Sequence, residues 1–186
     1  MSSIDPAFPI LTTARLTLRA VRPDDAAPFH ALMSIADTTR YSNWPDLPSL
    51  DDIAKTIERM SGTFAADTGC CWIIEDRRTS DLVGSIRLNW IDREWKRGGI
   101  GYELHPTYWR QGVATEALRA VVACSHGAFD LNRLEAWTLP GNGASDRVLE
   151  KAGFQFEGVR RENAWFKGAF HDFRAFARLR GDALEG

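Results

Sequence analysis

The sequence predicts an α/β domain of the mixed α+β kind, built on a largely antiparallel central sheet. Its 186 residues, 44% of them hydrophobic, are enough to bury one core. Three strand-like segments follow one another between residues 71 and 104 with only short turns between them, which favours antiparallel hairpins. Segments with helical periodicity precede and follow these strands. Together these observations predict a sheet flanked by helices.

The first part of the chain should supply one strand and two helices. Arg15–Val21 alternates apolar and polar residues, which is typical of a strand. Pro23–Asp25 places two acidic residues at the positive end of a helix dipole, so a helix should begin there and run to about Ile35. Ser49–Asp52 resembles a capping box with Asp in place of Glu or Gln. The helix that it opens has an apolar stripe made of Ile53, Ile57, Met60 and Phe64.

The middle of the chain should form three strands in succession. They are Cys71–Glu75, Leu82–Ile91 and Gly98–Leu104, with turns at 77–80 and around 93–94 between them. Because these connections are short, each strand should pair with the next in an antiparallel hairpin.

The rest of the chain should continue with a helix, a strand, a short helix and a final hairpin. Tyr108–Ala117 leads from a turn into the first helix, and Leu134–Leu139 is the strand. Asn142–Ala152 is the short helix, which Gly153 can end in the left-handed conformation. The order of elements is then β-α-α-β-β-β-α-β-α-β-β. The final hairpin consists of Phe154–Phe166, the turn Lys167–Gly168 and Phe170–Leu179.

Composition argues against several kinds of partner. With 26% charged residues and a net charge of -2, the chain has no strong field to attract nucleic acid or an anionic membrane. No stretch approaches the ~18 apolar residues of a membrane span, and residues 1–9 lack the basic and apolar regions of a signal peptide. We therefore expect a cytoplasmic protein. Cys70 and Cys71 are adjacent, which suits neither an ordinary disulfide nor metal-ligand spacing. We expect all three cysteines, Cys124 included, to be small core residues, and no metal; the alternative for Cys124 is a nucleophilic role.

The segment from Tyr108 to Ala117 has the features of an anion site. The first amides of a helix have no intrahelical acceptor, and the helix dipole adds positive potential there. Small residues such as Gly112 and Ala114 let a phosphate group approach those amides. An ordinary loop-to-helix junction explains the same spacing equally well.

Two motifs carry a resemblance to the GNAT acetyltransferases. Gly101–Ala117 resembles their acetyl-CoA signature, Gln/Arg-x-x-Gly-x-Gly/Ala, and is similar above all to the ribosomal-protein-alanine N-acetyltransferase branch. Gly112 and Ala114 match the two small positions, while Trp109 departs from the Gln/Arg position. Pro140–Phe154 resembles the family's Asn-x-x-Ser-x-x-Val-Leu-Glu-Lys-x-Gly-Phe block. Two motifs in the right order are far more specific than one.

The resemblance implies a single GNAT domain over residues 1–186, with a core of about 10–180. It also implies an acetyl-CoA-dependent N-acetyltransferase without a metal, in which a primary amine attacks the thioester directly. The acceptor is either a protein N-terminal α-amine or a small molecule. The alternative is a catalytically idle acyl-CoA-binding regulatory module. The residues implied to contact the coenzyme are Leu104, His105, Trp109, Arg110, Gln111, Gly112, Val113, Ala114, Thr115 and Asn142.

Two residues are candidates for proton transfer. Ser145 stands at the family's serine position, and the resemblance favours a role for it in protonating the leaving thiolate. The alternative is that it supports the start of its helix. A backbone amide near Leu104 or His105 should stabilise the oxyanion. Glu103 shares a strand face with Gly99 and Gly101 by alternation and could act as the base, or it could be an ordinary strand glutamate.

The acceptor side is less well specified. In this family the loop that carries Tyr41 and Trp44 borders the acceptor site. Enzymes that acetylate protein N-termini carry a glutamate where this chain has Ala164, and Glu162 should share that strand face by alternation. His105 and His171 are alternative bases. The final hairpin has alternating apolar residues, and related proteins often pair through such elements, which allows a homodimer. Core packing is the expected role for any one of Trp90, Trp95 and Trp165, although these could also line a pocket.

Overall fold

The structure is a computed structural model that describes residues 7–182. Residues 1–6 and 183–186 lie outside the described residues. They include both ends of the domain expected over 1–186 and most of residues 1–9, where a signal peptide was considered. The elements in chain order are β1 (Leu11–Thr12), β2 (Leu16–Ala20), α1 (Ala26–Met33), α2 (Ala36–Thr39), α3 (Leu50–Gly62), β3 (Cys70–Asp76), β4 (Leu82–Asp92), β5 (Arg97–Leu104), α4 (Val113–Gly127), β6 (Arg133–Thr138), α5 (Gly143–Lys151), β7 (Gln155–Phe166) and β8 (Ala169–Leu179).

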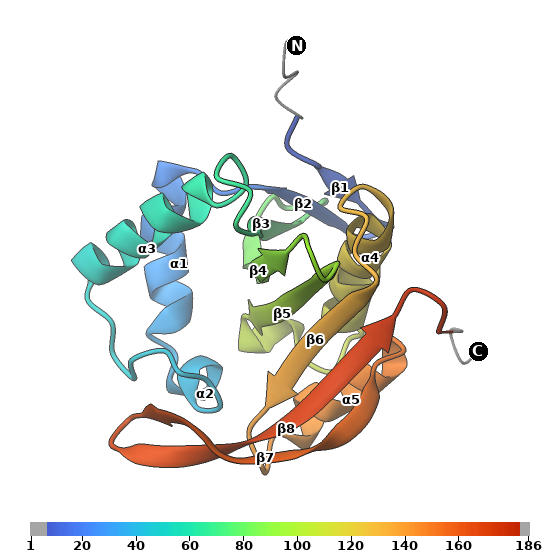
Figure 1. Ribbon diagram of the computed structural model, residues 1–186. Coiled ribbons are helices and arrows are strands. Elements are labelled where there is room, and N and C mark those ends of the chain that lie inside the picture. The colour runs from blue at the N-terminus through green and yellow to red at the C-terminus, as the bar shows by residue number, and fades with distance from the viewer. Residues whose placement is uncertain (1–6, 183–186) are drawn as a thin grey trace.

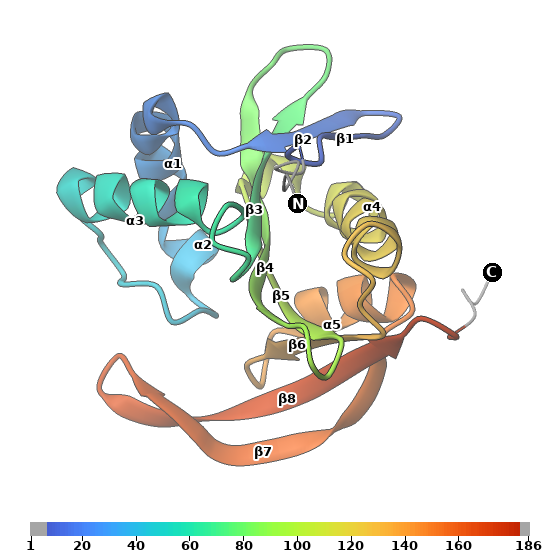
Figure 2. The same cartoon turned by 45° about the horizontal axis from the view of Figure 1, so that its top comes forward.

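One sheet organises the molecule. Its eight strands lie in the order β1-β2-β3-β4-β5-β6-β8-β7 (Figure 1). Helices α1, α2 and α3 cover one face, and α4 and α5 cover the other, as Figure 2 shows. We call these the α1–α3 face and the α4–α5 face. The predicted fold class is therefore confirmed.

Every predicted strand and helix is present, with bounds that differ by a few residues. Ser49 and Asp52 form the predicted capping box: the Ser49 hydroxyl accepts from the Asp52 amide at 3.1 Å, and the Asp52 carboxylate accepts from the Ser49 amide at 3.3 Å. Pro23–Asp25 is a short 3₁₀ turn that leads into α1. Strand β1 and helix α2 were not predicted, because segments of 2 and 4 residues carry too little periodicity.

Strands β5 and β6 form the one parallel pair of the described sheet, and their pairing is short. It joins Arg97–Gly99 to Arg133–Glu135 and stops there. Towards its end at Leu104, β5 remains paired with β4 alone. The two strands therefore separate towards their carboxyl ends. The gap between them leaves one edge of β5 free at the point where the chain turns into α4.

The final hairpin crosses the sheet beside β6, with β8 inserted between β6 and β7. The register of β7 shifts between Arg160 and Ala164, and Glu162 has a positive φ of 47°. This bulge interrupts the alternation of side chains. The expectation that Glu162 shares a face with Ala164 by strand parity is therefore wrong.

Each face of the sheet has its own buried cluster. Phe29, Ile53 and Ile57 pack on the α1–α3 face, while Trp72 and Phe176 belong to the α4–α5 cluster. The three cysteines are free: Cys70 and Cys71 are buried as expected, while Cys124 is only half-buried and packs against the edge of the α4–α5 cluster. Among residues 7–182, no helix has the length and apolar character needed to cross a membrane.

Candidate active site

The amino end of α4 is an open cluster of backbone amides. Gly112 caps the helix with a φ of +75°, and Arg110 before it also has a positive φ of 60°. A Cβ added to Gly112 would meet nothing nearer than the Arg15 guanidinium at 3.6 Å. The first helical amides have no intrahelical acceptor. The geometry therefore gives an anion free access to the amides of Val113, Ala114 and Thr115.

The loop before α4 is held by its own side chains. The Trp109 indole donates to the Leu104 carbonyl at 2.9 Å, and the Gln111 amide donates to the Thr107 carbonyl at 2.6 Å. The His105 ring accepts from the Thr107 amide at 3.3 Å. These three side chains, which we expected at the coenzyme, point back into the loop. Their structural role here is to fix the backbone that enters α4.

Basic side chains border this helix end, and sequence reasoning missed them. An open groove lies beside Gly112 and Thr115, with Arg15, Arg119 and Lys151 on its rim. Arg15 pairs with Glu116 at 2.6 Å and also donates to the Gln111 carbonyl at 2.9 Å. No local spacing could have revealed the rim, because its residues come from three distant parts of the chain.

Ser145 meets a tyrosine that the sequence did not single out. The hydroxyl oxygens of Ser145 and Tyr102 lie 2.7 Å apart, which joins α5 to β5 near the gap. Burial raises the pKa of Tyr102, so its phenol stays protonated throughout the neutral range. The Asn142 side chain caps α5 by accepting from the Ser145 amide at 3.3 Å. Asn142 thus fills the capping role, while the Ser145 side chain points towards β5.

Glu103 lies at the centre of a buried polar cluster on the α1–α3 face. One oxygen accepts from the Trp44 indole at 2.6 Å and from the Arg87 guanidinium at 2.7 Å. The other accepts from the Ser85 hydroxyl at 2.9 Å and again from Arg87. Burial acts to raise the pKa of Glu103, but the Arg87 charge and these hydrogen bonds outweigh it and lower the pKa. The side chain is therefore an ionised carboxylate whose acceptor sites are occupied.

The loop after α2 reaches this cluster. Trp44 contacts Glu103 and packs edge-on against Phe29, with ring centroids 5.8 Å apart. A Cβ on Gly141 would lie 3.7 Å from the Tyr41 ring, so Tyr41 borders the turn that precedes α5. Lys167, at the tip of the final hairpin, pairs with Asp46 at 2.6 Å. The hairpin tip and the loop therefore close this end of the α1–α3 face.

Glu162 and His171 stand apart from the cluster. Glu162 is exposed in the β7 bulge, where its amide donates to the Asp172 carboxylate at 2.8 Å. The His171 ring lies 3.0 Å from the Phe166 carbonyl. Within residues 7–182, no hydrogen bond or ion pair links the Glu162 side chain to Glu103 or Arg87.

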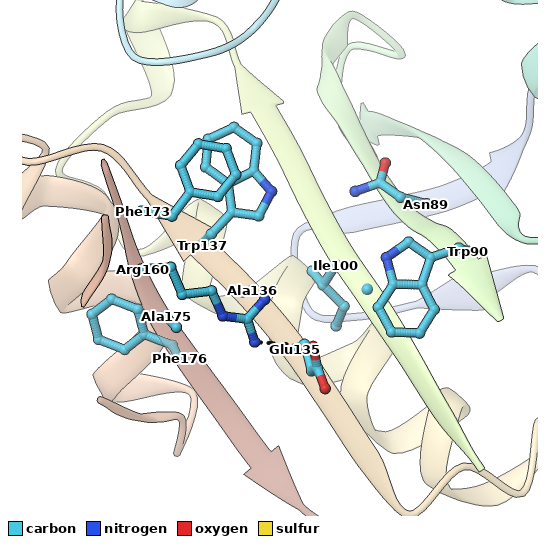
Figure 3. A pocket seen from close by; sticks show the side chains of 11 residues that line it. Asn89, Trp90, Ile100, Glu135, Ala136, Trp137, Arg160, Phe173, Ala175 and Phe176 are labelled. Carbon is cyan, nitrogen blue, oxygen red and sulfur yellow. Dashed lines mark ion pairs between the residues drawn. The ribbon is translucent and has the colours of Figure 1, made fainter. Parts of the chain in front are cut away.

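A cavity of about 100 Å³ lies on the sheet where β5 and β6 pair (Figure 3). We call it the junction cavity. Trp90 stands at one side, and Trp137 stands at the other, with Arg160 reaching towards Glu135 between them. Trp90 is 38% exposed, while Trp95 and Trp165 are 70% and 63% exposed, so the expected core packing of these three tryptophans is wrong.

The described residues include no group of three or more His, Cys, Asp or Glu side chains placed to hold a metal ion.

Comparisons with known proteins agree with this geometry. The model of the acetyltransferase (GNAT) domain family matches residues 15–155. An uncharacterized N-acetyltransferase of Bacillus subtilis (strain 168), YoaA, is 35% identical over 170 residues, which cover 91% of this chain and 96% of that protein. The ribosomal-protein-serine acetyltransferase of Escherichia coli (strain K12) is 25% identical over 173 residues, 91% of this chain and 96% of that protein.

A solved structure shares the fold. It is a ribosomal L7/L12 alpha-N-protein acetyltransferase in complex with coenzyme A, with a TM-score of 0.84 and 22% identity. The match covers 92% of this chain and 98% of that chain. The family match, the relative at 35% identity and the shared fold lead to one conclusion: the chain belongs to the GNAT acetyltransferase family and is an acetyl-CoA-dependent N-acetyltransferase.

Proposed function

We propose that the protein transfers the acetyl group of acetyl-CoA to a primary amine by direct attack, and that the acceptor is a protein N-terminal α-amine or a small molecule. One observation carries this proposal. The gap between β5 and β6 leads to the open amides of α4, with the Tyr102–Ser145 hydroxyl pair beside it and Glu103 on the other face of β5. The thioester, the proton-donating hydroxyl pair and the acceptor amine can therefore all be positioned beside β5.

The coenzyme diphosphate would bind the amides of Val113, Ala114 and Thr115. A helix start provides both free N–H donors and positive potential, and Gly112 leaves the approach clear. Arg119 and Lys151 would add positive charge at the rim, where Arg15 is paired with Glu116. The pantetheine arm would then enter the gap and pair with the free edge of β5.

Of the two amides expected to bind the oxyanion, Leu104 is supported over His105. The His105 amide already donates to the Val83 carbonyl on β4 at 2.8 Å. Because successive amides of a strand point to opposite edges, the Leu104 amide faces the gap. The Tyr102 amide faces the gap for the same reason.

The hydroxyl pair would complete the transfer. The amine nitrogen bonds to the carbonyl carbon, the carbon–sulfur bond breaks, and the thiolate takes a proton from Ser145. Tyr102, protonated in the neutral range, holds that hydroxyl in place. The proton that the nitrogen loses returns through water to the hydroxyl pair.

Glu103 would hold neighbouring side chains in place and would not accept the ammonium proton itself. A carboxylate offers about four acceptor sites, and here Trp44, Ser85 and Arg87 fill them. Direct removal of the ammonium proton would require one of these bonds to break. We propose that Glu103 fixes Trp44 and Arg87 on the acceptor side and that water carries the proton away.

Coenzyme binding tests the α4 end of the proposal. Gly112→Glu puts bulk and negative charge at the diphosphate, so calorimetry should show acetyl-CoA affinity lowered more than ~100-fold. Gly127→Glu, at the other end of the same helix, is the matched control and should bind normally. Gly112→Asn separates charge from backbone strain, since Asn tolerates a positive φ. Equal affinity of Gly112→Glu and the native protein would overturn the assignment.

Thiol release tests the reaction. The native protein is supplied with acetyl-CoA and a panel of peptides with free N-termini, amino acids, polyamines and amino sugars. Release of the CoA thiol with at least one amine, and its loss in Gly112→Glu, supports an acetyltransferase. Tight coenzyme binding with no release for any amine would support the idle acyl-CoA-binding module instead.

A further inference from the structure

We infer that the junction cavity receives an aromatic ring of the acceptor, with an anionic group of the same acceptor at Arg160. This inference rests on the proposed function and names the acceptor class for it. The acceptor would be an amine whose molecule also carries, at a distance from the reacting nitrogen, a flat ring next to a carboxylate or phosphate. Four features of the cavity support it.

The first wall is built by a β-bulge. Leu88 pairs with Ile100 and Trp90 pairs with Gly99, so Asn89 has no partner on β5. The extra residue turns both Asn89 and Trp90 to the α1–α3 face, because the strand loses its alternation there. A Cβ at Gly99 would lie only 2.2 Å from the Trp90 indole nitrogen. Glycine at this position thus lets the indole lie against the strand and form the wall.

The opposite wall is also aromatic. Trp137 stacks on Phe173 with ring centroids 4.0 Å apart and an interplanar angle of 6°. Glu135 and Trp137 alternate with the buried Leu134 and Ala136, so they face the same side of the sheet as Trp90. Aromatic walls on both sides favour a flat ring, which gains from offset or edge contacts.

The size of the cavity limits what enters it. Its volume of about 100 Å³ is well below the roughly 300–1,000 Å³ of pockets that hold a whole ligand. It therefore suits one ring, with the rest of the acceptor outside. The strand rises about 3.3 Å per residue, so the cavity at Ile100 is about 7 Å from Tyr102 and about 13 Å from Leu104. The reacting amine must be separated from the ring by a similar distance.

The charge at the cavity points to an anion. Arg160 makes no side-chain hydrogen bond with residues 7–182, and its carboxylate partner is Glu135 at 3.8 Å. Glu135 is already held by Arg133 at 2.9 Å. The Arg160 donors are therefore available to a carboxylate or phosphate, which a guanidinium binds in a bidentate manner. A polycation would instead meet this guanidinium with like charge.

Short peptides test the acceptor class. Ala-Gly-Gly-Phe has an α-amine, a ring three residues away (about 10 Å along an extended chain) and a carboxylate. Ala-Gly-Gly-cyclohexylalanine keeps the volume without the aromatic ring, Ala-Gly-Gly-Phe amide removes the anion, and free phenylalanine is too short. The kcat/KM for Ala-Gly-Gly-Phe should exceed that of the cyclohexyl peptide about 2- to 12-fold. It should exceed that of the amide by about 10-fold or more. An aminoalkyl ester of a nucleoside monophosphate tests phosphate as the source of the anion.

Matched variants locate the effect. Trp90→Leu should remove the preference for the aromatic ring, while Trp95→Leu, in the turn of the same hairpin, should keep it. Arg160→Gln should make the kcat/KM of Ala-Gly-Gly-Phe equal to that of its amide, while Arg161→Gln should keep the difference between them. Acetyl-CoA affinity should stay unchanged in all four variants.

The result that overturns this inference leaves the proposed function intact. If other amines release the CoA thiol but the ring, the anion and the two variants make no difference, the junction cavity is not the acceptor pocket. If Gly112→Glu binds acetyl-CoA normally and no amine is acetylated, the proposed function itself fails.

Discussion

The two ends of the proposed reaction site are built from different materials. At the α4 end, the donors are backbone amides, and Gly112 contributes mainly by having no side chain. On the α1–α3 face, the groups are side chains that neighbouring strands and a loop bring together around Glu103. A backbone site tolerates many sequences as long as the small residues stay. The side-chain cluster depends on each of its members.

The largest effect should follow from breaking the cluster. Arg87→Ala leaves the buried Glu103 carboxylate without its cation, so the free energy of unfolding should fall by about 3–5 kcal/mol. Urea denaturation followed by fluorescence measures the change. Lys55→Ala removes an exposed pair with Asp51 and should leave the midpoint where it is. Equal midpoints for the two variants would show that the buried ion pair does not hold the α1–α3 face together.

Lowering the pH should reduce the free energy of unfolding in the same way as Arg87→Ala, but to a smaller extent and without a mutation. The pKa of Glu103 in the folded protein lies below its usual value of 4.5. The stabilisation that ionised Glu103 gives the folded protein is therefore fully present above about pH 4.5, and it is lost as the pH falls through the lower pKa that Glu103 has in the folded state. Urea midpoints from pH 7 down to pH 3 should show the drop. If Arg87→Ala loses as much stability on acidification as the native protein, other carboxylates are responsible.

Ser145→Ala tests the α5 side of the gap and should act on turnover. Loss of the proton donor should lower kcat about 100-fold, and acetyl-CoA affinity should not change. Ser61→Ala, an exposed serine on α3, is the control. If Ser145→Ala keeps native turnover, the hydroxyl has only a structural role at the start of α5.

The smallest effect is expected for Tyr102→Phe. It removes one hydrogen bond to Ser145, so kcat should fall about 2- to 12-fold while the KM for acetyl-CoA holds. Tyr108→Phe provides the comparison on the same side of the sheet. A Tyr102→Phe loss as large as that of Ser145→Ala would mean that the phenol itself takes part in proton transfer.

The sequence predicted the α4 end far better than the α1–α3 face. Gly112 and Ala114 could be proposed as the small residues of an anion site because such a helix start needs small residues at fixed spacing, and that spacing is local in the sequence. The partners of Glu103 could not, since Ser85 and Arg87 reach it across the β4–β5 pairing and Trp44 comes from a distant loop. The same limit hid Tyr102 as the partner of Ser145.

Strand alternation was reliable only where pairing was regular. It placed Glu103 correctly on the face of Gly99 and Gly101, because β5 has no irregularity of its own from Gly99 to Leu104. It failed for Glu162, where a bulge in β7 interrupts the period of two. A bulge is an adjustment between two paired strands, so one strand's sequence does not reveal it.

The sequence by itself determined the order of strands and helices, the anion-ready start of α4 and the motifs of the GNAT family. Each of these is a local pattern of apolar period, capping residue or glycine spacing. The tertiary structure alone decided that β5 separates from β6, that Glu103 is saturated by Arg87, Ser85 and Trp44, and that Trp90 turns into the junction cavity. These features arise from pairing and packing between segments far apart in the chain, whose registers no single segment encodes.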